Sequence, residues 1–281
     1  MAKQKIKLSK EKETLLVPLY CKACECEKEK PIIKDEKAKE IIERVEYNFT
    51  ELDVPNKTCV TLNIRANKLD EYVNQYIISH KNPTIIHLGC GLDNRYGRIK
   101  DENINFYDLD YQEVIELKKN FYQENENYHF ISSSVTDLDW INEVGEKPNV
   151  LIVAEGLFMY IAEEELKKLF NTLQEQWPNA HLIFDAYSKY TVKNIDKHAS
   201  IRKTGAEIKW GIDDPQEIED WNDNIKLVEE WYFTDYQQTE KLSPLYKLAF
   251  KAAGLFKMAK KAHRILYYEF KENEVEGNDS T

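Results

Sequence analysis

The stretch 84–98, TIIHLGCGLDNRYGR, constrains the fold more than any other part of this chain. It begins with a short apolar run containing β-branched residues, breaks at Gly89 and Gly91, and continues to Asp93. A buried strand that ends in a glycine-rich turn is typical of a parallel sheet with a nucleotide-like ligand at its edge. Glycine suits such a turn because it has no Cβ to collide with a ligand that approaches the backbone.

Apolar runs alternate with amphipathic segments after this point. Strands are predicted at 85–88, 104–109, 128–132, 150–154 and 180–185, and helices at 111–122 and 163–177. This order predicts an α/β fold, a mostly parallel sheet covered by helices. A sixth strand at 227–233, a helix from Ser243-Pro244 to Gly254 and a last strand at 263–270 follow.

The remaining segments are predicted to surround one domain spanning residues 1–281. Helices at 35–49 and 66–79, joined by a loop over 50–64, form an N-terminal helical cover within residues 1–80, with residues 1–12 frayed. Residues 84–185 form the binding core, and 225–271 hold the C-terminal strands and helix. The polar stretch 186–224 is long for a loop, which is typical of a lid insertion. Its aromatic residues either wall a binding site or pack normally: Tyr187, Tyr190, Trp210 and Trp221.

Composition limits the partners. The formal net charge is −11 with interspersed charges and no evident basic face, which argues against nucleic acid. No apolar run reaches the roughly 18 residues that span a bilayer. The first residues, MAKQKIKLSKEKE, lack the apolar stretch of a secretory signal, so we expect a cytoplasmic protein without a membrane partner. The sequence leaves the oligomeric state open.

Five cysteines in a chain with no export signal are expected to be free thiols. Cys21, Cys24 and Cys26 cluster as CKACEC, which leaves a metal site as an alternative. A structural zinc site needs four ligands, and the other two cysteines are distant in sequence. We therefore expect no metal.

Asp110 ends the second predicted strand, 19 residues after Gly91. A carboxylate at this position can accept hydrogen bonds from both ribose hydroxyls of a nucleoside. The alternative is that Asp110 caps the helix at 111–122, and both roles can hold together.

The glycine turn favours one nucleoside class over another. The dinucleotide fingerprint G-x-G-x-x-G requires a third glycine, where this chain has Asn94. Asp93 would also place negative charge where a pyrophosphate should lie. A cationic or zwitterionic nucleoside without phosphate, such as S-adenosylmethionine (SAM), fits better, and an NAD-dependent oxidoreductase remains the alternative.

Three more residues lie at predicted strand ends. Asp137 follows the third strand, where it either accepts a hydrogen bond from adenine or caps a turn at 138–142. Glu155 ends the fourth strand and is expected to face the ammonium or sulfonium of SAM. Tyr160 either lines the methyl-transfer site or packs as an aromatic with a hydrated hydroxyl.

Several stretches together resemble the leucine carboxyl methyltransferase family, in particular its bacterial branch of polyketide O-methyltransferases. The likeness covers about residues 13–270. It is carried by ETLLVPLYCKA with PIIKDEKA, the arginine of NIRANKLDEYV, HLGCGLDNR with YDLDYQEVIELK, and AEGLFMYI; WGIDDPQEIEDWN resembles the late insertion of the family.

The resemblance implies a class I SAM-dependent methyltransferase with a Rossmann-like, mostly parallel seven-stranded sheet, an N-terminal helical extension and a lid insertion. It implies that Arg65, which the residues alone would suggest is a surface ion-pair former, holds the SAM carboxylate. The other implied cofactor contacts are Gly89, Gly91 and Asp93 in the methionine-binding turn, Asp110 with the adjacent Tyr111 at the ribose, Asp137 and Leu138 at the adenine, and Glu155. The chain departs from the family pattern at Asn94, where threonine is common, and at Cys90, where alanine is common.

The implied reaction is O-methylation of a carboxylate or acidic hydroxyl on a small, aromatic or polyketide-like molecule, with Tyr160 as the candidate catalytic residue. A carboxylate is ionised at pH 7 and needs no base, whereas a phenol with a pKa of about 10 does. No convincing base is evident, because His87 lies within a strand and His198 is only a weak candidate in the insertion. The alternatives are a protein C-terminal carboxyl methyltransferase and a non-catalytic SAM-binding protein.

Overall fold

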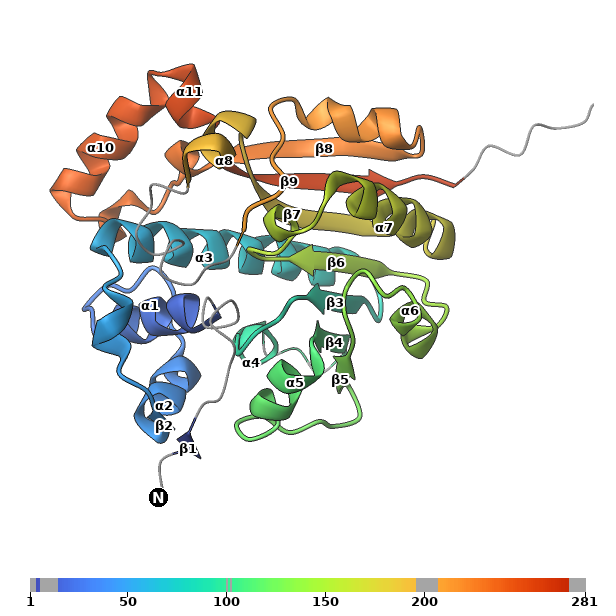
Figure 1. Ribbon diagram of the computed structural model, residues 1–281, viewed down its shortest axis with the longest axis horizontal. Helices are drawn as coiled ribbons and strands as arrows, with labels where there is room; N and C mark the ends of the chain where they lie inside the picture. The colour runs from blue at the N-terminus through green and yellow to red at the C-terminus, as the bar shows by residue number, and fades with distance from the viewer. Residues whose placement is uncertain (1–3, 6–14, 100, 102, 196–206, 273–281) are drawn as a thin grey trace, which may run out of the picture.

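A seven-stranded sheet forms the centre of the molecule (Figure 1). The structure is a computed structural model that describes residues 4–5, 15–99, 101, 103–195 and 207–272. The strand order is β5-β4-β3-β6-β7-β9-β8. The strands are β3 (Thr84–Leu88), β4 (Asn105–Asp110), β5 (Tyr128–Ser132), β6 (Val150–Ala154), β7 (His181–Tyr187), β8 (Ile225–Tyr232) and β9 (His263–Phe270). Each predicted strand is present within two residues of its expected ends, so the mostly parallel sheet is confirmed.

The pairing of β3 creates a crevice at the edge of the sheet. It pairs in parallel with β4 on one side and with β6 on the other. The chain therefore leaves β3 towards one half of the sheet and later returns to the other half. Ligands of open α/β sheets bind at such a switch point, beyond the carboxyl ends of the strands. At the far side, β9 lies antiparallel between β7 and β8.

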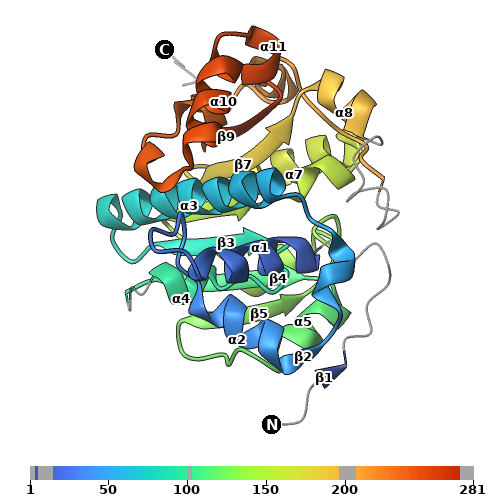
Figure 2. The same ribbon diagram turned by 90° about the vertical axis from the view of Figure 1, so that its left-hand side faces the viewer.

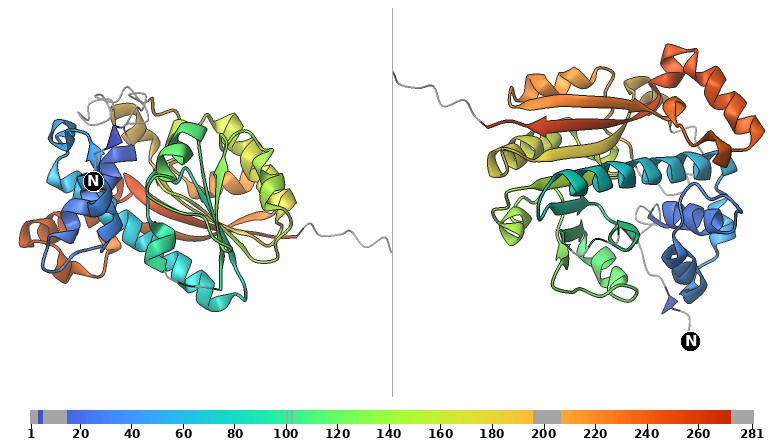
Figure 3. Two further views of the ribbon diagram at one scale, coloured as in Figure 1. Left: turned by 90° about the horizontal axis from the view of Figure 1, so that it is seen from below. Right: turned by 180° about the vertical axis from the view of Figure 1, so that it is seen from behind.

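Helices cover both faces of the sheet (Figures 2 and 3). Alternation along β3 explains this, because Ile85 joins one hydrophobic cluster while Ile86 and Leu88 join the other. The first cluster contains residues of α1 (Leu16–Cys26), α2 (Glu36–Arg44), α3 (Asn56–Ser79), α4 (Arg95–Ile99) and α5 (Gln112–Lys118). The second contains residues of α6 (Trp140–Val144), α7 (Glu163–Gln176) and the 3₁₀ helix η4 (Pro215–Trp221).

The N-terminal cover differs from its prediction in two places. The helix expected over 35–49 ends at Arg44, and Val45–Glu46 forms strand β2, which pairs with β1 (Gln4–Lys5); the 3₁₀ helix η2 (Phe49–Leu52) follows. The loop expected over 50–64 is wrong after Pro55, because α3 begins at Asn56. Its first turns hold residues of low helix propensity, and burial of Val60 and Ile64 outweighs that preference.

The expected lid is partly described. The first part holds α8 (Lys189–Ile195), and η4 lies near its end. His198 and the rest of 196–206 lie outside the described residues. The division into cover, core, lid and C-terminal part stays a prediction.

The C-terminal part contains the predicted helix α10 (Pro244–Gly254), whose cap is Ser243, followed by α11 (Lys257–Lys260). Short 3₁₀ helices lie at Phe158–Tyr160 (η3), Phe233–Asp235 (η5) and Thr239–Lys241 (η6). Within the described ranges, no helix has both the length and the apolar composition needed to cross a bilayer.

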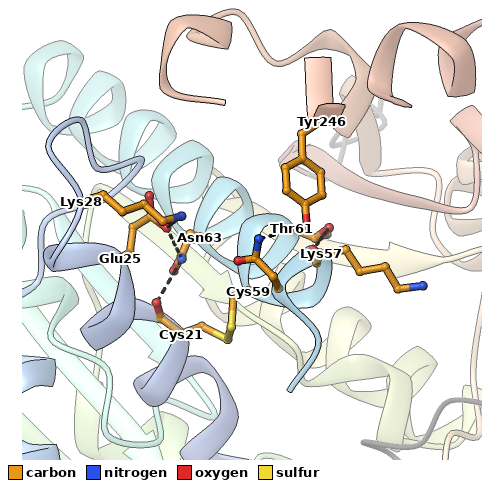
Figure 4. Close-up of a disulfide and its surroundings, with 9 residues drawn as sticks. Cys21, Glu25, Lys28, Lys57, Cys59, Thr61, Asn63 and Tyr246 are labelled. Carbon is orange, nitrogen blue, oxygen red and sulfur yellow. Dashed lines mark hydrogen bonds and ion pairs between the residues drawn. A yellow bond between two sulfur atoms is a disulfide. The ribbon is translucent and has the colours of Figure 1, made fainter. Parts of the chain in front are cut away.

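A disulfide joins α1 to α3 (Figure 4). Cys21 and Cys59 are bonded with their Cα atoms 4.8 Å apart, whereas Cys24, Cys26 and Cys90 are free. The expectation of five free thiols is therefore wrong for two of them, because the packing of the two helices brings together residues 38 positions apart. The bond also removes Cys21 from the alternative metal-ligand set.

We predict that Cys59→Ser lowers the free energy of unfolding. The bond restricts the unfolded chain, and a loop of this length corresponds to about 2–4 kcal/mol in the chain-entropy model. Urea unfolding of the oxidised protein measures the loss, and Cys24→Ser, which removes an exposed free thiol, is the matched control. Equal unfolding midpoints for wild type and Cys59→Ser under oxidising conditions would contradict the prediction.

Candidate functional site

The glycine turn after β3 lies at the switch point of the sheet. Gly89 and Gly91 have φ angles of +62° and +51°, a region that favours glycine. A Cβ built on Gly89 would lie 2.9 Å from Cδ1 of Leu157, so a larger residue does not fit there. The turn thus follows a tight path along one wall of a cavity.

Asp110 faces the same cavity from the end of β4. One carboxylate oxygen accepts a hydrogen bond from the Gly91 N–H at 2.8 Å, and the other accepts from the Tyr111 N–H at 2.8 Å. Burial raises the pKa of Asp110, and these two hydrogen bonds oppose that rise. The alternative role as a helix cap is not observed, because α5 is capped at Tyr111. Asp110 instead fixes the glycine turn against β4.

The adenine candidates lie beside the cavity rather than in its wall. The wall after β5 is formed by residues 133–136, while Asp137 is exposed and Leu138 is half-buried outside the lining. Asp137 also does not cap the following helix, since that position is taken by Asp139. Tyr111 lines the cavity together with Asp110.

Asp93 and Glu155 carry no uncompensated negative charge. Asp93 accepts hydrogen bonds from Lys22 at 2.7 Å and from Arg98 at 2.8 Å. Glu155 accepts from Arg65 at 3.1 Å and from Arg95 at 2.5 Å. Cations of the chain itself thus already pair with both acids, and their expected position beside a cationic ligand stays a prediction.

These cations also keep the carboxyl groups of Asp93 and Glu155 ionised. Burial alone would raise the pKa of Asp93, but the charges of Arg98 and Lys22 outweigh it and hold that pKa well below its usual value. For Glu155 the charges of Lys22 and Arg65 likewise overcome the effect of burial and lower the pKa. Both carboxylates are thus ionised at neutral pH.

Asp185, near the end of β7, connects three parts of the site. It accepts hydrogen bonds from the Gly156 N–H at 2.6 Å, Nη1 of Arg65 at 3.0 Å and Nε2 of His263 at 2.8 Å. Burial would raise the pKa of Asp185, but the charge of Arg65 and the bond from His263 lower it. Gly156 is required here, since a Cβ would lie 3.0 Å from the guanidinium of Arg65.

His263 is a functional candidate that the sequence analysis missed. It lines the cavity at the start of β9, and its ring lies between those of Tyr187 and Phe233, with centroids 4.3 and 4.4 Å away. Burial lowers the pKa of His263, although the hydrogen bond to Asp185 opposes this, so the imidazole is neutral at pH 7. No local motif marks it, because its partner Asp185 lies 78 residues earlier.

Tyr160 and Tyr187 line the same side of the cavity. Burial raises the pKa of both hydroxyls, so they are protonated and can donate hydrogen bonds but cannot act as bases at neutral pH. Of the other lid aromatics, Trp210 is buried in the second hydrophobic cluster, Trp221 packs against it, and Tyr190 is exposed. Tyr187 alone among the four lines the cavity.

His87 is buried within β3, as expected, and it also lines the cavity. Its Nδ1 lies 3.0 Å from a carboxylate oxygen of Asp108. Lys22 was also missed by the sequence analysis, because only the packing of α1 on the sheet brings it to Asp93.

One cavity of about 860 Å³ is lined by most of these groups, whereas Asp185, Asp137 and Leu138 are not among its lining residues. It extends from Asp110 and residues 133–136 at the β4–β5 side, past the glycine turn and Arg65, to Tyr187 and His263 at the β7–β9 side. Its volume is near the upper end of the range for small-molecule sites, roughly 300–1,000 Å³. A nucleoside at the glycine turn would therefore leave room for a second small molecule towards His263.

Several known proteins are similar to this chain in sequence. A family model described as leucine carboxyl methyltransferase matches residues 16–174. The chain is 30% identical over 266 residues to the tetracenomycin polyketide synthesis O-methyltransferase TcmP of Streptomyces glaucescens, covering 94% of this chain and 98% of TcmP. It is 28% identical over 292 residues to the S-adenosyl-L-methionine-dependent methyltransferase dpfgK of Gibberella zeae, with 95% and 98% covered.

Among solved structures, a DUF574-family protein from Streptomyces avermitilis is similar in fold, with a TM-score of 0.55 at 10% identity. The match covers 76% of this chain and 85% of that protein. The sequence relationships, together with the mostly parallel seven-stranded sheet and the cavity at its switch point, place the chain as a member of the leucine carboxyl methyltransferase family.

Proposed function

We propose that this methyltransferase transfers a methyl group from SAM to an oxygen atom of a small molecule bound at the β7–β9 end of the cavity. The observation that carries the proposal is the continuity of the cavity between Asp110 at one end and the Asp185–His263 pair at the other. The cofactor supplies an activated methyl group on a sulfonium, so the protein contributes mainly alignment and exclusion of water.

The residues present fit this cofactor. The glycine turn gives a narrow passage beside the backbone, and Asp110 is held by two N–H groups with its carboxylate at the cavity wall, as hydrogen bonding to ribose hydroxyls requires. Arg65 is anchored through Nε and Nη1, while Nη2 has no hydrogen-bond partner within the described part of the chain. We assign that Nη2 to the SAM carboxylate, with Gly89, Gly91 and Asp93 along the amino-acid part.

The remaining cofactor assignments rest on the resemblance and on neighbourhood. Tyr111 lies next to the ribose position, and Asp137 with Leu138 borders the wall formed by residues 133–136, so we keep them as adenine contacts in the proposal. Glu155 acts as a positioning residue, since it orients Arg65. Tyr160 is proposed to donate a hydrogen bond to the acceptor, because its phenol is protonated and lines the cavity.

The Asp185–His263 pair favours an acidic hydroxyl as the acceptor over a carboxylate. Donation from Nε2 to Asp185 leaves Nδ1 of the neutral imidazole as the proton acceptor. A hydroxyl proton can move to Nδ1 as the oxygen attacks the methyl group, and Asp185 stabilises the imidazolium formed. A carboxylate acceptor would need none of this. The titratable and charged side chains near His263 are those of Asp185, Tyr187, Arg65 and Arg264.

A polyketide-like acceptor is the finer proposal, supported by the name of the Streptomyces relative. A protein carboxyl terminus, as the family description suggests, is the second candidate. Family membership sets aside the NAD-dependent oxidoreductase. Mass spectrometry after incubation with SAM separates the two candidates: methylation of phenolic polyketides supports the proposal, and methylation of leucine-ended peptides alone refutes it.

The cytoplasmic location stays a prediction. Structural disulfides are rare in the reducing cytosol, so the Cys21–Cys59 bond counts against this location.

We predict that Asp110→Ala weakens SAM binding by about 1–3 kcal/mol, because the ribose hydroxyls lose a charged partner. Isothermal calorimetry with SAM measures the change. Asp139→Ala, which removes a nearby exposed carboxylate outside the cavity, is expected to bind like wild type. Unchanged affinity in Asp110→Ala would refute the ribose assignment, and the same titration of Asp137→Ala tests the adenine contact.

We also predict that His263→Gln lowers kcat on a phenolic acceptor by about 10²-fold, the usual contribution of a general base. Because the pKa of His263 lies below its ordinary value of about 6.5, wild-type activity is full at pH 7 and falls as the pH is lowered through that pKa.

The pH profile distinguishes the base from a structural role. In His263→Gln the fall below pH 6.5 disappears, while SAM affinity is retained; His129→Gln is the matched control on β5. A parallel loss of SAM affinity, or an unchanged acidic limb, would contradict a role as base.

A further inference from the structure

Within the described residues, exposed large hydrophobic side chains gather on α10 and α11. Neither helix has a buried residue. Among the described residues, nine large hydrophobic side chains are exposed, and five of them lie on these helices or between them. We call this group the apolar patch: Leu245, Leu248, Leu255, Phe256 and Met258.

Helix α10 uses only one side to contact the protein. Tyr246 and Phe250, four residues apart, pack against the first hydrophobic cluster. Leu245 and Leu248, three residues apart, share another side that is open. The linker to α11 is similarly exposed, with the side chains of Leu255 and Phe256 80% and 66% accessible. A monomeric globular protein rarely leaves such apolar side chains contiguous and uncovered.

Positive charge is concentrated in the segment that carries the apolar patch. Residues 241–262 contain six lysines and no acidic residue, in a chain of net charge −11. Lys260 pairs with Asp235, whereas Lys247, Lys251, Lys257 and Lys261 have no ion-pair partner within the described ranges. The expectation that the charges leave no basic face is therefore wrong for this surface.

We propose that α10 and α11 dock on an anionic lipid bilayer, with the apolar patch in the interface and the lysines against the headgroups. Interfacial helices combine Leu and Phe on one side with flanking Lys in this way. Lysine stems can lie along apolar surface while their ammonium groups reach the headgroups. A protein partner is less favoured, because protein interfaces are depleted in lysine and the segment that carries the apolar patch is rich in it.

The position of these helices suits such docking. They project at one corner of the molecule, on the side opposite α2 (Figure 2). Tyr246 reaches the first turn of α3, where its hydroxyl accepts a hydrogen bond from Nδ2 of Asn56 at 3.2 Å (Figure 4). The next two residues, Lys57 and Thr58, line the cavity. The proposed membrane surface therefore adjoins one wall of the cavity.

The proposed contact is a surface and not a membrane span. No membrane partner was expected from the sequence, because the chain has no apolar run long enough to cross a bilayer. Two short helices produce no such run, and only their exposure in the folded chain shows the patch.

The test is flotation of the full-length protein with vesicles of phosphatidylcholine alone or mixed with phosphatidylglycerol. We expect binding to the anionic vesicles only, weakened by added salt. Leu255→Ser with Phe256→Ser, and separately Lys251→Glu with Lys257→Glu, should each lower the bound fraction about tenfold or more, since both burial and charge contribute.

Matched variants elsewhere control for apolarity and charge. Ile78→Ser removes an exposed apolar side chain of α3, and Lys30→Glu with Lys168→Glu makes the same change in net charge. Both should bind like wild type, and circular dichroism should show that every variant is folded. No binding to anionic vesicles, equal binding to neutral ones, or an equal loss in the controls would overturn the proposal. Dimerisation abolished by Leu255→Ser with Phe256→Ser would overturn it too, because the patch would then bind a second copy.

Discussion

The paired charges of Arg65, Glu155 and Asp185 hold the helical cover to the sheet. Arg65 comes from α3, Glu155 follows β6 and Asp185 belongs to β7, and all three are buried at the sheet edge. A buried charge is tolerated only when it is paired and hydrogen-bonded, so each of these groups requires the others. Burial disfavours the charged form of Arg65, but Asp185 and Glu155 reverse this and raise its pKa. The position of α3 over the cavity follows from this pairing.

The same network divides the cavity into two chemical environments. On one side, the glycine turn and Asp110 present backbone and a carboxylate to the cavity, where we propose that the nucleoside binds. On the other, Asp185 holds His263 in one orientation between two aromatic rings. Because Asp185 also fixes Arg65 and the Gly156 N–H, the group that orients the candidate base also orients the candidate cofactor ligand. In the binding mode that we propose, one carboxylate therefore sets the positions of both cofactor and acceptor.

Sequence reasoning predicted the parts of the fold that depend on local pattern. The apolar runs gave all seven strands of the main sheet, and Ser243-Pro244 gave the start of α10, because strand burial and helix capping depend on residues close in sequence. It failed at the start of α3, where burial of Val60 and Ile64 outweighs weak helix propensity. It did not predict the ion pairs of Asp93, because Lys22 and Arg98 approach it from separate helices.

The sequence by itself determined where the strands lie along the chain, the glycine turn and the acids at strand ends. Each of these depends on neighbouring residues and on the spacing of apolar residues. The family motifs in it also indicated the class of reaction. Only the tertiary structure decided which charges meet, which cysteines bond, which histidine pairs with Asp185 and which apolar side chains stay uncovered. These features join residues far apart in the chain, and their pairing depends on the packing of helices on the sheet, which no local pattern records.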